Sequence, residues 1–165
     1  MIRADLDMQR MVQTKGKADS PLHVIFTVTV GDQCIGLPIE CVRTVFHASA
    51  VTPVPLAPPR VIGLINLRGH VVCAICMHTS LGAGPPESPA ALMVAVEHRG
   101  DTYALAVDKV GDVLEVRDED RVPLLATGTG LQRAATLGVF RTKDQIIPVL
   151  NIEALLDAEH AAVAA

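Results

Sequence analysis

The residues of this chain best suited to chemistry are two cysteines and two histidines that lie close together in the sequence. Cys73 and Cys76 form a C-x-x-C pair, and His70 and His78 flank it. Thiolates and imidazoles at such spacing are typical of zinc sites and of redox pairs. The alternative is that the thiols only pack in a buried strand, where cysteine behaves as a small hydrophobic residue.

Strand geometry favours the packing interpretation. The stretch from Val71 to Met77 is apolar and lacks the glycine that a zinc-binding knuckle usually has. Side chains three residues apart in a strand point to opposite faces, so Cys73 and Cys76 would not face the same ligand. A c-type haem site also fails, because Met77 follows Cys76 where a histidine is required. We therefore expect no metal and no cofactor, and a thiol- or zinc-dependent sensor using Cys73 and Cys76 is kept as the rival hypothesis.

Common enzyme motifs are absent from the sequence, including the hydrolase elbow, the phosphate loop and the His-Glu-x-x-His helix. Two acids, Glu40 and Asp108, fall at equivalent positions of an internal repeat described below. A catalytic pair would have to converge from two separate lobes, so solvated or capping acids at turns are the favoured interpretation. We expect no catalytic residues and no enzymatic activity.

A short polar segment, Asn66-Leu-Arg-Gly69, lies between two apolar stretches and predicts a tight hairpin turn. Arg68 would then be held at the surface by a rigid support. Arginine makes forked contacts and is enriched in interfaces, which suggests a docking residue. An ordinary solvated turn arginine is equally compatible with the spacing.

The composition narrows the function classes. Half of the 165 residues are hydrophobic, but only 2% are aromatic, so the core must be built from aliphatic side chains. The net charge is −4 and no basic cluster stands out, which argues against nucleic acid as a partner. No apolar stretch approaches the ~20 residues that span a bilayer, so no membrane insertion is expected. Charged residues stand where a signal peptide would have its apolar segment, so we expect no export. A cytoplasmic location is therefore expected, and with it four reduced cysteines.

The pattern along the chain predicts about ten short strands, frequent Gly/Pro turns and a helix after Asn151. It also contains a faint repeat in register. Residues 37–45 return as 105–113, and residues 62–72 return as 137–147 in the same order. The repeat predicts two small barrels packed together, because each alone would have a meagre core. The expected boundaries are a flexible lead-in at 1–21 and one domain at 22–157, with lobes at about 22–82 and 90–150 and a final helix at about 151–163.

These residues resemble the chemotaxis coupling protein family, CheW, over about 24–156. The most specific match is Pro58-Pro-Arg-Val-Ile-Gly-Leu-Ile-Asn-Leu-Arg-Gly69, which is similar to the family's proline and Gly-x-x-Asn-x-Arg-Gly signature. The resemblance implies a mainly β fold of two packed five-stranded SH3-like barrels. It also implies a non-enzymatic adaptor in the cytoplasm at receptor arrays, which bridges the tips of methyl-accepting chemoreceptors to the regulatory domain of a CheA-type histidine kinase.

By this resemblance, six positions are linked to partner contact or to the shape of the contact surface: Val42, Gly63, Asn66, Arg68, Gly69 and Val113. Arg68 is the strongest candidate, and Gly63 is expected to allow a close approach of backbone. The chain departs from the family pattern where Cys73, Cys76 and His78 replace a proline, an aspartate and an arginine, and where Thr44 replaces a frequent acid. These departures leave open a non-standard array, controlling surface motility or another output, and a degenerate member with a structural role only.

Overall fold

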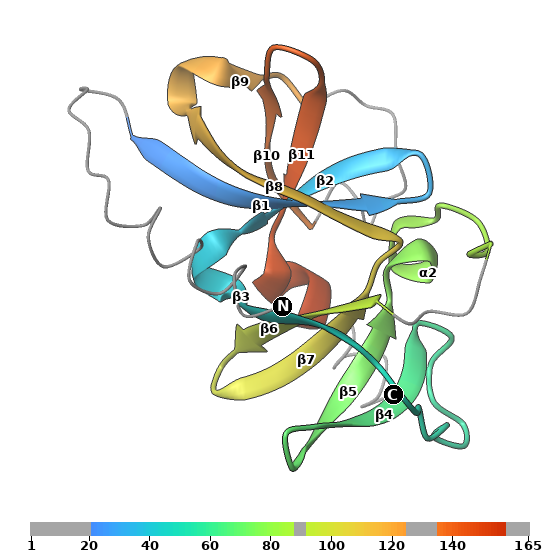
Figure 1. Cartoon of the computed structure of the whole chain (residues 1–165). Coiled ribbons are helices and arrows are strands. Elements are labelled where there is room, and N and C mark those ends of the chain that lie inside the picture. The colour runs from blue at the N-terminus through green and yellow to red at the C-terminus, as the bar shows by residue number, and fades with distance from the viewer. Residues whose placement is uncertain (1–20, 88–91, 125–134, 158–165) are drawn as a thin grey trace.

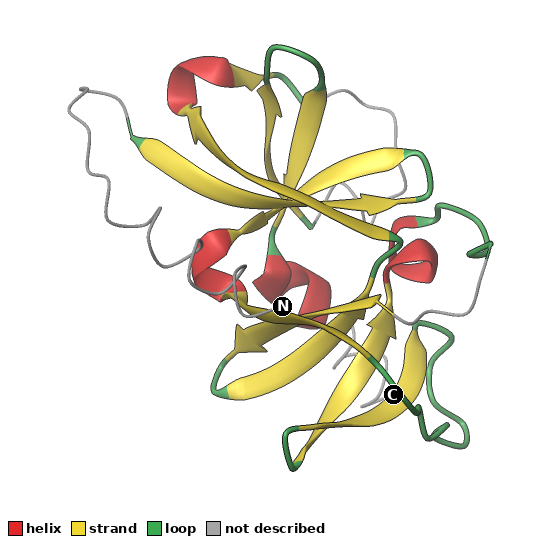
Figure 2. Cartoon of the chain, viewed as in Figure 1, coloured by secondary structure: helices red, strands yellow, loops and turns green. Residues whose placement is uncertain are grey.

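Alternating β-branched residues and frequent turns make the described part of this chain mainly β. The computed structural model describes residues 21–87, 92–124 and 135–157, and its strands form two sheets that pack against each other (Figures 1 and 2). The six-stranded sheet, called sheet A, has the order β8 (Lys109–Arg117), β1 (Leu22–Val30), β2 (Gln33–Pro38), β11 (Ile146–Leu150), β10 (Thr136–Arg141), β9 (Arg121–Val122). The five-stranded sheet, called sheet B, has the order β3 (Val42–His47), β6 (Leu92–His98), β7 (Asp101–Ala106), β5 (His70–Cys76), β4 (Val61–Leu67).

Short helices occupy the connections. A 3-10 turn, η1 (Ile39–Cys41), precedes β3, and another, η2 (Asp118–Asp120), precedes β9. The helix α2 (Met77–Leu81) follows β5, and residues 152–157 are helical after β11. Asn151 caps this last helix, since its side-chain oxygen accepts a hydrogen bond from the Ala154 N–H at 3.1 Å. The prediction of a mainly β fold with two packed barrels is confirmed. The lead-in before residue 21 and the helix beyond residue 157 lie outside the described residues.

The two sheets do not coincide with the lobes expected at 22–82 and 90–150. The hairpin of β1 and β2 lies in sheet A with the C-terminal strands, and the hairpin of β6 and β7 lies in sheet B with β3, β4 and β5. Each half of the sequence therefore gives its first hairpin to the other half. Sequence similarity identifies the repeated unit, but it does not say with which copy the strands of that unit pair.

The strand orders themselves support the internal repeat. If β1, β2, β3, β4 and β5 are replaced by β6, β7, β8, β10 and β11, the partners in one sheet become the partners in the other. The parallel pairing of β5 with β7 becomes the parallel pairing of β11 with β2. Among the strands in the described residues, the two-residue β9 alone is left without a counterpart. The chain is thus a duplication whose halves have exchanged hairpins.

The exchange places the main hydrophobic core between the sheets. The largest cluster of buried residues takes side chains from both sheets, from α2 and from the last helix, including Val28, Leu37, Val94, Leu105 and Leu155. Each sheet has in addition only a smaller cluster of its own. Since the largest cluster is shared, neither sheet has a sufficient core alone.

Two segments carry the chain between the sheets. The first, through η1, leads from β2 to β3, and the second leads from β7 through Val107 and Asp108 to β8. They correspond to each other in the repeat, because residues 37–45 match residues 105–113. These two crossings and the shared core fix the position of sheet A relative to sheet B, and with it the position of the hairpins on their surfaces.

A mutation in the shared core should destabilise both sheets together. Leu105 has an exposed fraction of 0% and belongs to the largest cluster, so Leu105→Ala should lower the free energy of unfolding by about 2–5 kcal/mol. Urea unfolding followed by amide NMR signals should show sheets A and B unfolding at one common, lowered midpoint. The control is Leu64→Ala, which removes a side chain that is 37% exposed and should cost much less. A lowered midpoint in sheet B alone would contradict the shared core.

Candidate docking surface

The turn between β4 and β5 presents Arg68 at the tip of a rigid hairpin. Arg68 and Gly69 both have positive φ, 52° and 85°, as a two-residue type I′ turn requires. The side-chain oxygen of Asn66 accepts a hydrogen bond of 2.8 Å from the Gly69 N–H and fastens the turn. Glycine at the second position avoids the steric cost of left-handed backbone, and nothing lies within 4 Å of where its Cβ would be. Asn66, Arg68 and Gly69 therefore form one structural unit, the hairpin turn, and all three are exposed.

A second arginine in the same kind of turn gives an internal comparison. Arg99 and Gly100 form the turn between β6 and β7, with φ of 51° and 84°. Arg99 is engaged within the molecule, since it forms ion pairs of 3.1 Å with both Glu153 and Asp157 on the last helix. Arg68, in contrast, forms no ion pair or side-chain hydrogen bond with any residue in the described ranges. Its five N–H donors remain available for a carboxylate outside the molecule.

Gly63 allows a close approach of two chain segments, as the sequence predicted. Its φ is 154°, and a Cβ built on it would contact the carbonyl group of Thr52, with the carbonyl carbon at 2.9 Å. The approaching backbone forms two hydrogen bonds of 2.8 Å between Thr52 and Leu64. Gly63 thus ties the proline-rich connection before β4 to the edge of sheet B and fixes the outer side of the hairpin.

Val42 and Val113 lie apart from the hairpin tip. Val42 begins β3, has an exposed fraction of 6% and belongs to the shared core. It can influence a partner only through the shape of the surface above it. Val113 in β8 is half-buried, pairs with Phe26 of β1 and packs against the same core. The six residues linked by the resemblance therefore do not form one patch. Three lie at or beside the hairpin tip, one fixes its edge and two lie at the junction of the lobes.

The outward face of β4 and β5 carries two apolar residues that the sequence pattern did not single out. Leu64 is 37% exposed and Val71 is 69% exposed. Val71 is paired with Asn66, and Leu64 lies two residues before Asn66, so these side chains share one face of the sheet. Exposed and buried side chains alternate around the buried Ile65, but the sequence is apolar on both faces there and does not reveal which one is exposed. An apolar face beside an unpaired arginine is an arrangement typical of protein interfaces.

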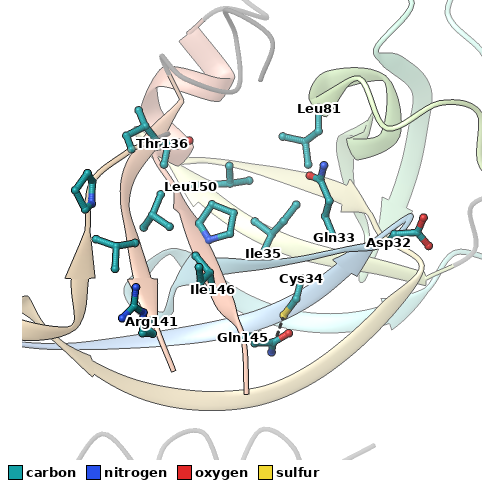
Figure 3. A pocket seen from close by; sticks show the side chains of 15 residues that line it. Asp32, Gln33, Cys34, Ile35, Leu81, Thr136, Arg141, Gln145, Ile146 and Leu150 are labelled. Carbon is teal, nitrogen blue, oxygen red and sulfur yellow. Dashed lines mark hydrogen bonds between the residues drawn. The ribbon is translucent and has the colours of Figure 1, made fainter. Parts of the chain in front are cut away.

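An apolar groove of about 620 Å³ lies on the other lobe (Figure 3). Ile35, Leu150 and Ile146 line it from β2 and β11, and Leu81 of α2 stands on its rim. Ile146 is 51% exposed and occupies the repeat position of Val71, so each lobe exposes an apolar residue beside its hairpin.

The four residues of the C-x-x-C segment are dispersed. His70 is exposed at the start of β5, Cys73 packs against the shared core, and His78 is buried in α2. No three histidine, cysteine or acidic side chains within the described part of the chain are placed to hold a metal ion. Burial raises the pKa of the Cys34 thiol, and a hydrogen bond from Gln145 only partly opposes this effect (Figure 3). Burial also raises the pKa of the Cys41 thiol.

Two small barrels that have exchanged hairpins and expose apolar residues beside their hairpin turns define a class of two-lobed β proteins. A family model described as the CheW-like domain matches residues 24–160. The chain therefore belongs to the CheW-like domain family. None of the described helices has the length and apolar character needed to span a membrane.

Individual relatives agree with this family. The chain is 31% identical over 127 residues to a probable chemotaxis protein CheW of Rhizobium etli, covering 76% of this chain and 82% of that protein. It is 29% identical over 131 residues to chemotaxis protein CheW of Rhizobium meliloti, covering 79% and 84%. The crystal structure of scaffolding protein TtCheW from Thermoanaerobacter tengcongensis is similar with a TM-score of 0.73 and 26% identity, covering 82% of this chain and 92% of that chain.

Substituting Gly63 tests the close approach at the edge of sheet B. Gly63→Ala introduces strained backbone and forces a Cβ against the Thr52 carbonyl, so it should lower the free energy of unfolding by about 3 kcal/mol. Gly69→Ala is the matched control: it adds the backbone strain without a steric contact and should cost about 1 kcal/mol. Chemical denaturation measures both values. Equal losses would mean that the approach of Thr52 does not constrain Gly63.

Proposed function

We propose that this chain is a non-enzymatic signalling adaptor that couples the cytoplasmic tips of chemoreceptors to the regulatory domain of a CheA-type histidine kinase. Membership of the CheW-like domain family supports this function. The names of the relatives connect them with chemotaxis, and the similar solved structure is called a scaffolding protein. An adaptor of this kind acts in the cytoplasm at receptor arrays and needs surfaces rather than a reaction centre.

The observation that carries the proposal is the state of Arg68. Two arginines occupy the same type of turn, and one of them, Arg99, is neutralised by two carboxylates of the chain itself. Arg68 has the same rigid support and no such partner in the described ranges. A rigid, unpaired guanidinium is suited to docking, because little conformational entropy is lost when it meets a carboxylate.

Exposed apolar side chains on both lobes support a bridging role. Val71 on sheet B and Ile146 on sheet A lie at equivalent hairpin positions, at 69% and 51% exposure. A chain with one such surface on each lobe can hold two partners side by side. The replacements at Cys73, Cys76 and His78 alter the segment behind the hairpin, so the array served by this chain need not be a standard one.

Charge reversal at the hairpin tip tests the proposal. Arg68→Glu should weaken binding of the kinase regulatory domain from the same organism at least tenfold, which corresponds to about 1.4 kcal/mol, because an attractive contact becomes repulsive. Isothermal titration calorimetry with the purified domain measures the effect. The matched control is Lys143→Glu, the same charge change at the equivalent, exposed hairpin position of sheet A.

The outcomes separate the function from the residue. If wild type binds neither the kinase domain nor a receptor fragment of that organism, the adaptor function is wrong. If both variants bind the kinase domain as wild type does, the adaptor function stands and Arg68 is not in the interface. If the two variants lose affinity equally, the effect is one of net charge and not of the hairpin tip.

A further inference from the structure

The second crossing between the sheets is fastened by a side chain that the function described above does not use. Asp108 lies between β7 of sheet B and β8 of sheet A. Its Oδ2 accepts a hydrogen bond of 2.7 Å from the Gly31 N–H, in the turn between β1 and β2. The same oxygen lies 2.7 Å from Nε2 of His78 in α2, which follows a strand of sheet B. The Asp108 N–H donates in addition to the Thr29 carbonyl at 3.0 Å.

His78 is held on both sides. Its side chain is only 6% exposed, and its Nδ1 lies 3.1 Å from the carbonyl oxygen of Gly84. The carbonyl oxygen of Gly84 and the ionised carboxylate of Asp108 can both only accept, so the two hydrogen bonds form when Nδ1 donates to Gly84 and Nε2 donates to Asp108. A buried ring with both nitrogens committed cannot leave Asp108 without losing hydrogen bonds that water does not readily replace there. His78, Asp108 and Gly31 therefore join α2, the crossing and a turn of sheet A in one cluster.

The first crossing has no such fastening. Glu40 is the repeat equivalent of Asp108 and lies in η1, between β2 and β3. Its side chain is exposed and forms no hydrogen bond or ion pair within the ranges that the structure covers. Of two equivalent crossings, one is thus fastened by a carboxylate, whereas the other is held by apolar packing of Ile39, Cys41 and Val42 against the shared core. Both positions carry an acid, but within the described residues only the carboxylate of Asp108 has hydrogen-bond partners. The repeat thus provides an internal comparison for the role of Asp108.

We propose that His78, Asp108 and Gly31 form a latch that sets the relative orientation of the two sheets, with the crossing at residues 39–41 as the pivot. The shared core keeps the sheets together, and the latch selects one angle between them. The latch also holds the Arg68 hairpin of sheet B at a fixed angle to the surface of sheet A. The importance of this angle for bridging two partners rests on the proposed adaptor function. Asp108 and His78 are then positioning residues: they touch no partner, yet they decide whether two partners fit at once.

Residual dipolar couplings of backbone amides test the latch on the isolated full-length protein. In wild type, couplings from sheets A and B should fit a single alignment tensor on the present structure. In Asp108→Ala, each sheet should still fit by itself, but the two tensors should differ in orientation. Amide exchange at Gly31 should become at least tenfold faster, because its acceptor is gone. The matched control, Glu40→Ala at the equivalent crossing, should leave both measurements at their wild-type values.

Further variants separate the latch from general stability. Asp108→Asn keeps an oxygen acceptor at the same place and should restore the single tensor. If Asp108→Ala does not fold, His78→Gln opens the cluster from the other side and should give the same change in orientation. A single tensor with the wild-type orientation, in Asp108→Ala or in His78→Gln where the former does not fold, would overturn the proposal.

Binding measurements on the same variant test whether the latch matters for the adaptor function. Asp108→Ala should bind the kinase regulatory domain and a receptor fragment singly with wild-type affinity, but should form the three-component complex at least tenfold less well. Wild-type protein that binds neither partner would sink the adaptor function and leave the result on orientation intact. An unchanged three-component complex with altered tensors would overturn only the role of the latch in bridging.

Discussion

The exchange of hairpins between the two halves of the chain is the constraint on which the rest of the structure depends. With an aromatic share of 2%, the chain has few large side chains and must assemble its core from many aliphatic ones. Each sheet alone buries only a small cluster, and the largest cluster exists only when both sheets are present. Giving β1 and β2 to one sheet and β6 and β7 to the other makes the sheets inseparable, because each contains strands from both halves.

This constraint explains why few local interactions are enough to fix the position of the Arg68 hairpin. The hairpin of β4 and β5 needs only a type I′ turn, one Asn66 hydrogen bond and the close approach at Gly63 to hold Arg68 in place. Behind it, sheet B is anchored to sheet A through the shared core. A scaffold that holds two partners in a fixed geometry benefits from such anchoring, since little conformational entropy is lost when a pre-organised surface binds.

Two pairs of similar residues in similar local settings have different uses in this chain. The turn arginine Arg99 braces the last helix against sheet B, whereas Arg68 in the matching turn type faces solvent. The acid Asp108 joins three segments, whereas Glu40 at the equivalent crossing is exposed. In each pair one member stabilises the fold and the other is left available. The physical basis is the same in both cases: a charged side chain is engaged within the molecule only where the fold places oppositely charged or hydrogen-bonding groups beside it.

The sequence by itself determined the local structure. Alternation of β-branched residues specified the strands, Arg68-Gly69 specified a turn that needs positive φ, and the family resemblance implied a close backbone approach at Gly63. The repeat was visible for the same reason, because side-chain periodicity and turn chemistry act over a few residues. Only the tertiary structure decided with which copy each hairpin pairs, that Val42 is buried, and that His78 meets Asp108. Those contacts join residues 30 or more positions apart or depend on burial by a distant strand, and a local pattern carries no record of which distant partner completes it.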